Sequence, residues 1–207
     1  MELQYFGANC VRITTKKAQL VVDDNLGSLG LKAITKPDDL SLHTSHDFKG
    51  PDSRFVANTP GEYEIADVVI HGVGARSLKD EEGRTNAVIY TVTADDLRVA
   101  IIGHIHPDLS DDQLEKIGLV DIAIVPVGGN AYTLDGLGAL QIIKKLEPKI
   151  AIPTHFEDKA TRYEVPQQSL AEALKGLAME PLETLDKYKP KHSELADTTH
   201  LIVLNRQ

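Results

Sequence analysis

Cysteine is almost absent from this sequence, which has Cys10 alone among its 207 residues. A single cysteine forms no disulfide within the chain and cannot build a thiolate-rich metal site, which fits a reducing compartment. The N-terminal segment Met1–Phe6 has no basic stretch followed by a long apolar one, as a secretory signal would have. We therefore expect a cytoplasmic protein.

Long apolar runs and an excess of basic charge are also lacking. No apolar run approaches the ~18 residues of a membrane-spanning helix, so no membrane association is expected. Lys and Arg number 22 against 31 Asp and Glu, for a net charge of −9. Binding to a phosphate backbone would need a concentrated basic face to overcome that field. The short basic run Lys187–His192 is explained as a solvated loop, so no nucleic-acid partner is expected.

The composition is that of an ordinary globular protein, with 42% hydrophobic and 26% charged residues and no low-complexity tract. A chain of 207 residues can bury one full core, whereas two domains would each be small. No internal repeat of fixed period is present. We expect residues 1–207 to form a single domain.

Strands are predicted in the first half, where short apolar or β-branched runs lie between Gly, Pro, Asn and Asp turn signals. The runs are Leu20–Val22, Arg54–Val56, Val68–Ile70, Val88–Val92 and Arg98–Gly103. The acidic connector Asp95–Leu97 between the last two predicts a hairpin. An antiparallel meander is the natural interpretation.

Helices and strands alternate in the second half. Capping residues at Ser110–Gln113 predict a short helix, and apolar residues at helical spacing predict helices over Leu134–Leu146 and Pro166–Leu177. The remaining apolar runs predict strands at Val120–Val125, Lys149–Pro153 and Leu201–Leu204. This order predicts an α/β fold in which each half contributes a sheet, the sheets stack, and helices lie outside.

Four of the eight histidines fall at expected strand ends, where a rigid scaffold presents reactive groups: His46, His104, His106 and His155. A metal site without thiolates needs histidine and carboxylate ligands. In Gly103–Pro107 an H-x-H pair on an extended segment would point both imidazoles to one side and share a cation. Solvated histidines at a turn are an equally good explanation. The segment His43–Asp47, taken alone, indicates only a surface loop.

Several segments, in order along nearly the whole chain, resemble the L-ascorbate-6-phosphate lactonase-like group of the metallo-β-lactamase superfamily. They are Phe6–Ile13, Val21–Asp23, Ser45–Asp47, Pro60–Ile65, Arg84–Val88, Ile101–His104, Val125–Gly129, Thr133–Asp135 and Pro153–Phe156. Each is short, but their collinear order is much more specific than any one of them. The resemblance implies a four-layer αβ/βα sandwich and descent from Zn-dependent hydrolases.

The metal loop of that family, H-x-H-x-D-H, is largely lost here. With His46 at the first histidine position, Phe48 takes the second, Gly50 the aspartate and Pro51 the last histidine. Three of the four expected ligands are missing, so the motif is degenerate.

The other ligand segments depart from the family in part. His104 stands where the resemblance implies a bridging aspartate, and residues 76–80 lack a histidine that many relatives carry. His155 alone keeps its expected place. A neutral imidazole cannot bridge two cations as a carboxylate can, so we do not expect the family's dinuclear zinc centre. Asp23, near the metal loop in active relatives, is expected to orient a turn.

Two hypotheses from different classes remain. In the first, His46, His104 and His155 hold one zinc or other divalent transition metal, and Asp135 accepts a proton, in a hydrolase of a lactone, ester or phosphoester. In the second, the three histidines are remnants lining a pocket without metal, and the fold serves in small-molecule binding or as a scaffold. Ligand loss from several separate segments favours the second, since one loss is easier to compensate than many. A homo-oligomer is left open.

Overall fold

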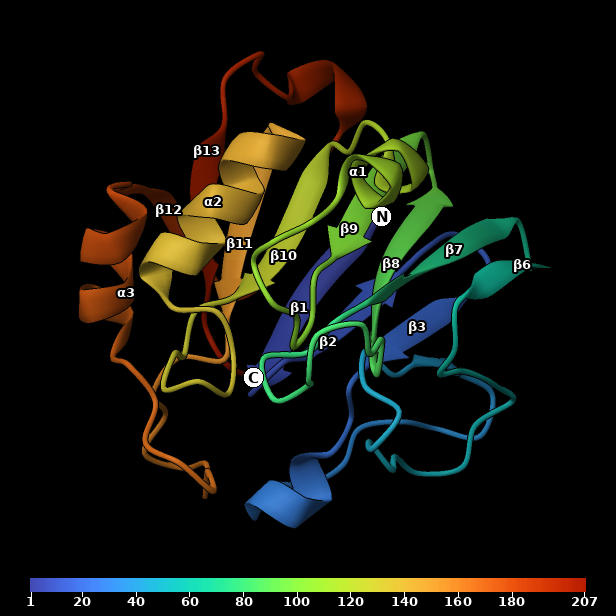
Figure 1. The fold of residues 1–207 in the computed structure, drawn as a ribbon. Helices are drawn as coiled ribbons and strands as arrows, with labels where there is room; N and C mark the ends of the chain where they lie inside the picture. Colours follow the sequence, from blue (N-terminus) through green and yellow to red (C-terminus); the bar gives the residue numbers. More distant parts are fainter.

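The computed structural model describes residues 1–207 as two β-sheets stacked face to face (Figure 1). The smaller sheet has five strands in the order β1-β2-β3-β4-β5. Their bounds are Glu2–Gly7, Cys10–Thr14, Gln19–Val22, Leu40–Leu42 and Phe55–Ala57. β1, β2 and β3 pair antiparallel, whereas β3, β4 and β5 pair parallel.

The larger sheet has eight strands in the order β12-β13-β11-β10-β9-β8-β7-β6. The antiparallel part consists of β6 (Gly61–Ile65), β7 (Val68–Ala75), β8 (Ala87–Ala94) and β9 (Leu97–Ile101). The parallel part continues with β10 (Ile122–Pro126), β11 (Ile150–Thr154), β13 (His200–Leu204) and β12 (Pro181–Leu185).

Three helices cover the outer face of the larger sheet: α1 (Asp111–Ile117), α2 (Gly136–Leu146) and α3 (Leu170–Leu177) (Figure 1). The outer face of the smaller sheet is covered by the short 3-10 helix η1 (Leu26–Leu29) and loops, with Leu26 packed on Cys10 and Val21. A second 3-10 turn, η2 (His192–Glu194), precedes β13. This confirms the predicted fold class, with one outer layer made of a 3-10 helix and loops. No helix combines the length and apolar character needed to cross a bilayer.

The strand sequences explain the layering. In β10, Ile122 and Ile124 enter the core between the sheets, whereas Ala123 and Val125 enter the core under the helices. Neighbouring strand residues point to opposite faces, and a strand covered on both sides is apolar at every position. β10 and β11 are accordingly buried along their whole length.

Three sequence predictions need correction. The meander fails after β3, because β4 and β5 join the smaller sheet in parallel. The halves of the chain do not form one sheet each, since the larger sheet already begins with β6. The third helix begins at Leu170, not Pro166, because Ser169 caps it in a reciprocal capping box with Glu172.

A late segment of the chain closes the free edge of β1. The backbones of Leu3 and Tyr188 exchange two hydrogen bonds of 2.8 and 2.9 Å, and Gln207 N donates to Tyr5 O at 2.9 Å. The segments that flank β12 and β13 therefore complete the smaller sheet on the side where β1 would otherwise be unpaired.

Candidate functional site

The ends of four strands from both sheets converge at one edge of the sandwich. Asp23 follows β3, Thr44 follows β4, His104 follows β9 and His155 follows β11. All four residues are buried. Loops at strand ends are held by the strands themselves, so these side chains are fixed in place.

A chain of buried hydrogen bonds joins these segments. Thr154 Oγ1 donates to Asn9 Oδ1 at 2.7 Å, and Asn9 Nδ2 donates to Asp23 Oδ2 at 2.7 Å. Thr44 donates to Asp23 twice, from its backbone N at 2.7 Å and from Oγ1 at 2.6 Å. Asp23 therefore orients a turn, as expected, and also connects the two sheets beneath the site.

Burial raises the pKa of Asp23 to about 6, although the hydrogen bonds from Thr44 and Asn9 act to lower it. The cost of removing the carboxylate from water thus exceeds the stabilisation of its charged form by three donors.

Gly103 sets the position of His104. Its φ of +65° lies in the left-handed region, and a Cβ at this position would overlap the side chain of Thr44. Only glycine combines this backbone with such a close approach. The turn places the backbone just before His104 against Thr44, which donates to Asp23.

His155 is held by its backbone and by its ring. Its φ is +59°, and its N donates to Ala8 O at 2.7 Å. Its Nδ1 lies 3.1 Å from Gln167 Oε1, and Gln167 Nε2 donates to Val165 O at 2.8 Å. Gly128 makes this contact possible, since a Cβ there would overlap Gln167 Oε1.

This arrangement assigns the tautomer of His155. An amide oxygen only accepts, so Nδ1 of the neutral ring carries the hydrogen and Nε2 is left with a free lone pair. Burial lowers the pKa of His155 to about 4, so the ring is neutral at physiological pH. A histidine oriented through Nδ1 by a carbonyl is suited to act through Nε2.

His104 has no hydrogen-bond partner on either ring nitrogen, although it is only 6% exposed. Burial, followed by the charges of His155 and Lys79, holds the pKa of His104 well below its usual range. The His104 ring meets those of His155, Phe48 and Tyr132 edge-on, at centroid distances of 5.0, 4.9 and 5.4 Å. An unpartnered buried imidazole is costly, so His104 offers a donor and an acceptor to a ligand or water.

A cavity of about 390 Å³ opens above His104. Its lining includes Phe48, Leu78 and Tyr132, which are its apolar members, together with the side chains of Lys79 and Asp47. The volume lies within the ~300–1,000 Å³ of typical small-molecule sites. The cavity is the best-formed candidate binding site on this edge of the sandwich.

Of the predicted ligands, the structure brings together only His104 and His155. His46 is exposed and does not line the cavity, whereas its neighbours Ser45 and Asp47 do. The expectation that His46 faces the site is therefore not met in this structure, in which Ser45 and Asp47 face the cavity.

Asp135 and His106 lie outside the cavity that His104 lines. Asp135 is the N-cap of α2, where its side chain accepts from Gly138 N at 2.8 Å, and it lines a separate small hollow. His106 faces the same hollow, and its Nδ1 accepts from Asp108 N at 3.2 Å. The predicted pairing of His104 and His106 on one side is not observed, because Ile105 N donates to Gly103 O at 3.1 Å and the chain turns at His104 instead of staying extended.

The side chains present do not fit a two-metal centre. Nowhere in the chain do three or more His, Cys, Asp or Glu side chains gather so that they could hold one ion. Two metals each need several ligands and a shared bridging oxygen. Instead, the His104 ring packs edge-on against the rings of His155 and Phe48.

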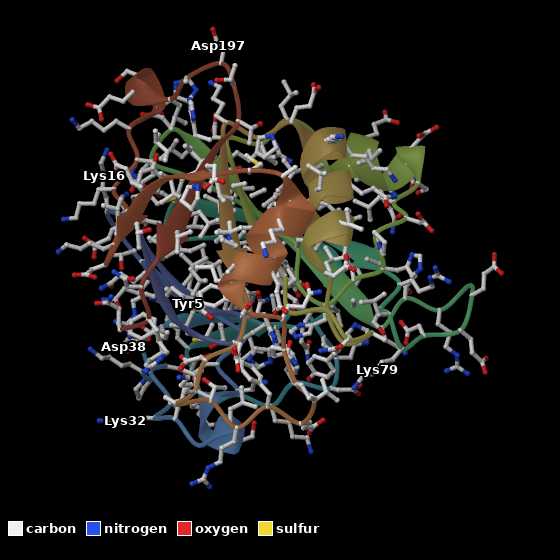
Figure 2. All side chains as sticks on the ribbon, turned by 90° about the vertical axis from the view of Figure 1, so that its left-hand side faces the viewer. Tyr5, Lys16, Lys32, Asp38, Lys79 and Asp197 are labelled. Atoms are coloured by element: carbon white, nitrogen blue, oxygen red, sulfur yellow. The ribbon has the colours of Figure 1, made fainter.

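Sequence reasoning missed the residues that shape the cavity. Lys79 Nζ lies 4.2 Å from the centroid of the Tyr132 ring, and both residues come from loops without periodicity. Figure 2 places Lys79 on a loop that projects from one side of the molecule. For Gln167, the only signal was its position just before the third helix.

The family described as "Beta-lactamase superfamily domain" matches residues 2–155. UPF0173 metal-dependent hydrolases of Thermoplasma acidophilum and Carboxydothermus hydrogenoformans are each 46% identical, over 46 and 43 residues. Each match covers 21% of this chain, and 20% and 19% of the respective relative, so the chain matches about a fifth of their length.

Similarity in structure covers almost the whole chain. A candidate Zn-dependent hydrolase of the metallo-β-lactamase superfamily from Thermotoga maritima aligns over 99% of this chain and 98% of its own, with TM-score 0.72 and 22% identity. A candidate metal-dependent hydrolase from Parabacteroides distasonis aligns over 99% and 93%, with TM-score 0.66 and 18% identity. At these identities the likeness establishes the fold, and the family match establishes the kinship. The chain belongs to the β-lactamase superfamily and has the metallo-β-lactamase fold of its metal-dependent hydrolases.

Proposed function

We propose that this protein is a binding member of its superfamily, in which a degenerate metal site has become a pocket for a small molecule. The observation that carries the proposal is the cavity floor. His104 is the only predicted ligand that lines the cavity, with His155 buried beside it, and the Phe48 ring packs edge-on against His104 at 4.9 Å. The pocket thus keeps its volume without the donors that metal-dependent hydrolysis requires.

The scaffold beneath the pocket supports the same proposal. Asp23, Asn9, Thr44 and Thr154 form a fully connected network that holds both sheets in register under the cavity. Such networks make a site rigid, and rigidity favours binding because little conformational entropy is lost when the ligand enters.

A metal-dependent hydrolase with a rebuilt mononuclear site is the second candidate, and one observation favours it. Both nitrogens of His104 lack partners, and the His104 and His155 rings lie 5.0 Å apart. Two imidazoles at this separation suit one shared ion, with further ligands from outside this pair. His46 would have to turn inward from its exposed position, and Asp135 would have to leave its role as the cap of α2.

Elemental analysis of the purified protein, before and after chelation, distinguishes the two candidates. The binding role predicts much less than one transition metal per chain, and no metal-dependent hydrolysis of lactones, esters or phosphoesters. About one zinc, manganese or iron per chain, lost in a His155→Ala variant, would overturn the binding role. Because His155 is buried, a His192→Ala variant serves as the control: it removes an exposed histidine that does not line the cavity and is a ligand in neither candidate.

We also propose that the protein is cytoplasmic and forms a single domain. A single cysteine, buried at Cys10, supports a cytoplasmic location. One hydrophobic core shared by both sheets supports treatment of residues 1–207 as one domain.

A further inference from the structure

We propose that the cavity binds a small planar organic carboxylate, with its negative charge at Lys79 and its ring between Phe48, Leu78 and Tyr132. This inference rests on the proposed binding function and names the class of ligand.

Lys79 lines the cavity and supplies positive charge to it. Its Nζ is held 4.2 Å from the Tyr132 ring centroid. A ligand that lies against the Tyr132 ring therefore meets an ammonium, and an anion is favoured there.

The turn that carries Lys79 is itself fixed. Asp80 Oδ2 accepts from Ser77 N at 2.9 Å and from Asn86 N at 3.2 Å, and Asp80 Oδ1 accepts from Asn86 Nδ2 at 2.8 Å. The Asp80 carboxylate is thus occupied by the loop's own donors. Lys79 is left to face the cavity without an ion-pair partner inside it.

His104 adds a hydrogen-bond donor to the cavity. An imidazole carries at least one N–H in either protonation state, and both ring nitrogens of His104 lack partners in the protein. A carboxylate oxygen can accept from this N–H while the charge of the group remains near Lys79. Such charge-assisted hydrogen bonds are about twice as strong as neutral ones.

The walls suit a flat, apolar ligand body. The Phe48 and Tyr132 rings stand at 88° and 83° to the His104 ring. Leu78 is the third apolar side chain of the lining. Aromatic walls bind planar rings by stacked or edge-on contacts worth ~0.5–1.5 kcal/mol beyond buried area.

The alternative is an organic ammonium, since aromatic rings and carboxylates also bind cations. Asp47, Asp80 and Glu164 also line the cavity, against Lys49 and Lys79. Of these charged groups, only the Lys79 ammonium lies over an aromatic ring. The one ammonium near the ring faces belongs to the protein itself, on Lys79, and a second cation would be repelled by it. The anion is therefore favoured.

Calorimetric titration with three ligands of similar size tests this choice: benzoate, neutral benzamide and cationic benzylamine. The protein is titrated before and after treatment with a chelator, and its metal content is measured each time. We expect benzoate to bind, benzamide to bind at least about tenfold more weakly, and benzylamine not to bind. Lys79→Met should lower benzoate affinity about tenfold and leave benzamide unchanged. Lys16→Met, an equally exposed lysine far from Lys79 in Figure 2, should change neither.

Each other outcome overturns the inference. If benzoate does not bind, or binds no better than benzamide, or if benzylamine binds best, the cavity does not select carboxylates. If Lys79→Met and Lys16→Met weaken benzoate equally, the effect is that of net charge alone. The proposed function fails separately: benzoate binding that disappears on chelation and is unchanged in Lys79→Met would indicate a resident metal. A metal-free protein that binds none of the three keeps its proposed binding role but loses this ligand class.

Discussion

Replacement of Asp23 by asparagine should change how stability depends on pH. Asp23 is fully buried at the junction of both sheets and accepts three hydrogen bonds of 2.6 to 2.7 Å. Burial nonetheless raises the pKa of its carboxyl group to about 6 from an ordinary value of 3.8. The folded protein therefore holds this proton more tightly than the unfolded chain does.

The sign and size of the effect follow from this difference. Between pH 4 and 6 the folded state binds the Asp23 proton and the unfolded state does not, so the stability contributed by this proton is lost as the pH rises. The difference between 3.8 and about 6, at ~1.4 kcal/mol per unit, gives a loss of about 3 kcal/mol by pH 7.

His155 acts in the opposite direction over nearly the same range. Burial lowers its pKa to about 4, so the unfolded chain binds this proton first and stability falls as the pH drops towards 4. The two effects nearly cancel in the wild-type profile. Only the difference between wild type and Asp23→Asn isolates the carboxyl group.

Urea unfolding followed by circular dichroism from pH 4 to 7.5 measures that difference. The free energy of unfolding of the wild type minus that of Asp23→Asn should fall by about 3 kcal/mol as the pH rises. Asparagine keeps an oxygen for Thr44 N, so the variant should fold. Asp38→Asn removes the same charge from an exposed site and should give a flat difference. If the wild-type minus Asp23→Asn difference in the free energy of unfolding is flat or rises with pH, the reasoning is refuted. The hydrogen bonds to Asp23 would then stabilise its charged form by at least as much as burial destabilises it.

Two further substitutions test the geometry of the site. Gly103→Ala should lower the free energy of unfolding in urea by about 3 kcal/mol, because the new Cβ would meet Thr44 and the backbone is left-handed. Gly83→Ala is the control: its backbone is also left-handed but has open space around it, so the loss should be about 1 kcal/mol. Equal losses would show that the contact with Thr44 is unimportant. Gln167→Leu should cost about 1–3 kcal/mol by leaving Nδ1 of His155 unpartnered, and should change the ¹⁵N shifts of that ring; unchanged shifts would mean that Gln167 does not set the tautomer.

The sequence predicted best the elements with a clear periodicity. β10 and β11 are apolar at every position because helices cover one face and the smaller sheet covers the other, and both were found where expected. The edge strands β6 and β12 were not predicted, because neither contains a fully buried residue and polar residues interrupt the pattern. The parallel pairing of β4 and β5 depends on long connections that leave no local signal.

The candidate site was predicted in part for similar reasons. His104 and His155 directly follow buried strands, so strand ends located them well. His46 lies in a loop, where a shift of one residue moves a side chain from the cavity to solvent. Phe48, Lys79 and Tyr132 are brought together by three separate loops, and no spacing in the sequence indicates that they meet.

The closure of β1 by the chain around Tyr188 and Gln207 has a consequence for the order of folding. During synthesis β1 precedes the segments of Tyr188 and Gln207, so its outer edge finds its partners only when those segments have left the ribosome. Until then the smaller sheet keeps an unpaired strand edge, of the kind that promotes aggregation in nascent chains. Contacts this distant in sequence also slow the search for the native state. The protein therefore completes its fold late, and we expect its nascent chain to depend on chaperones more than its size alone suggests.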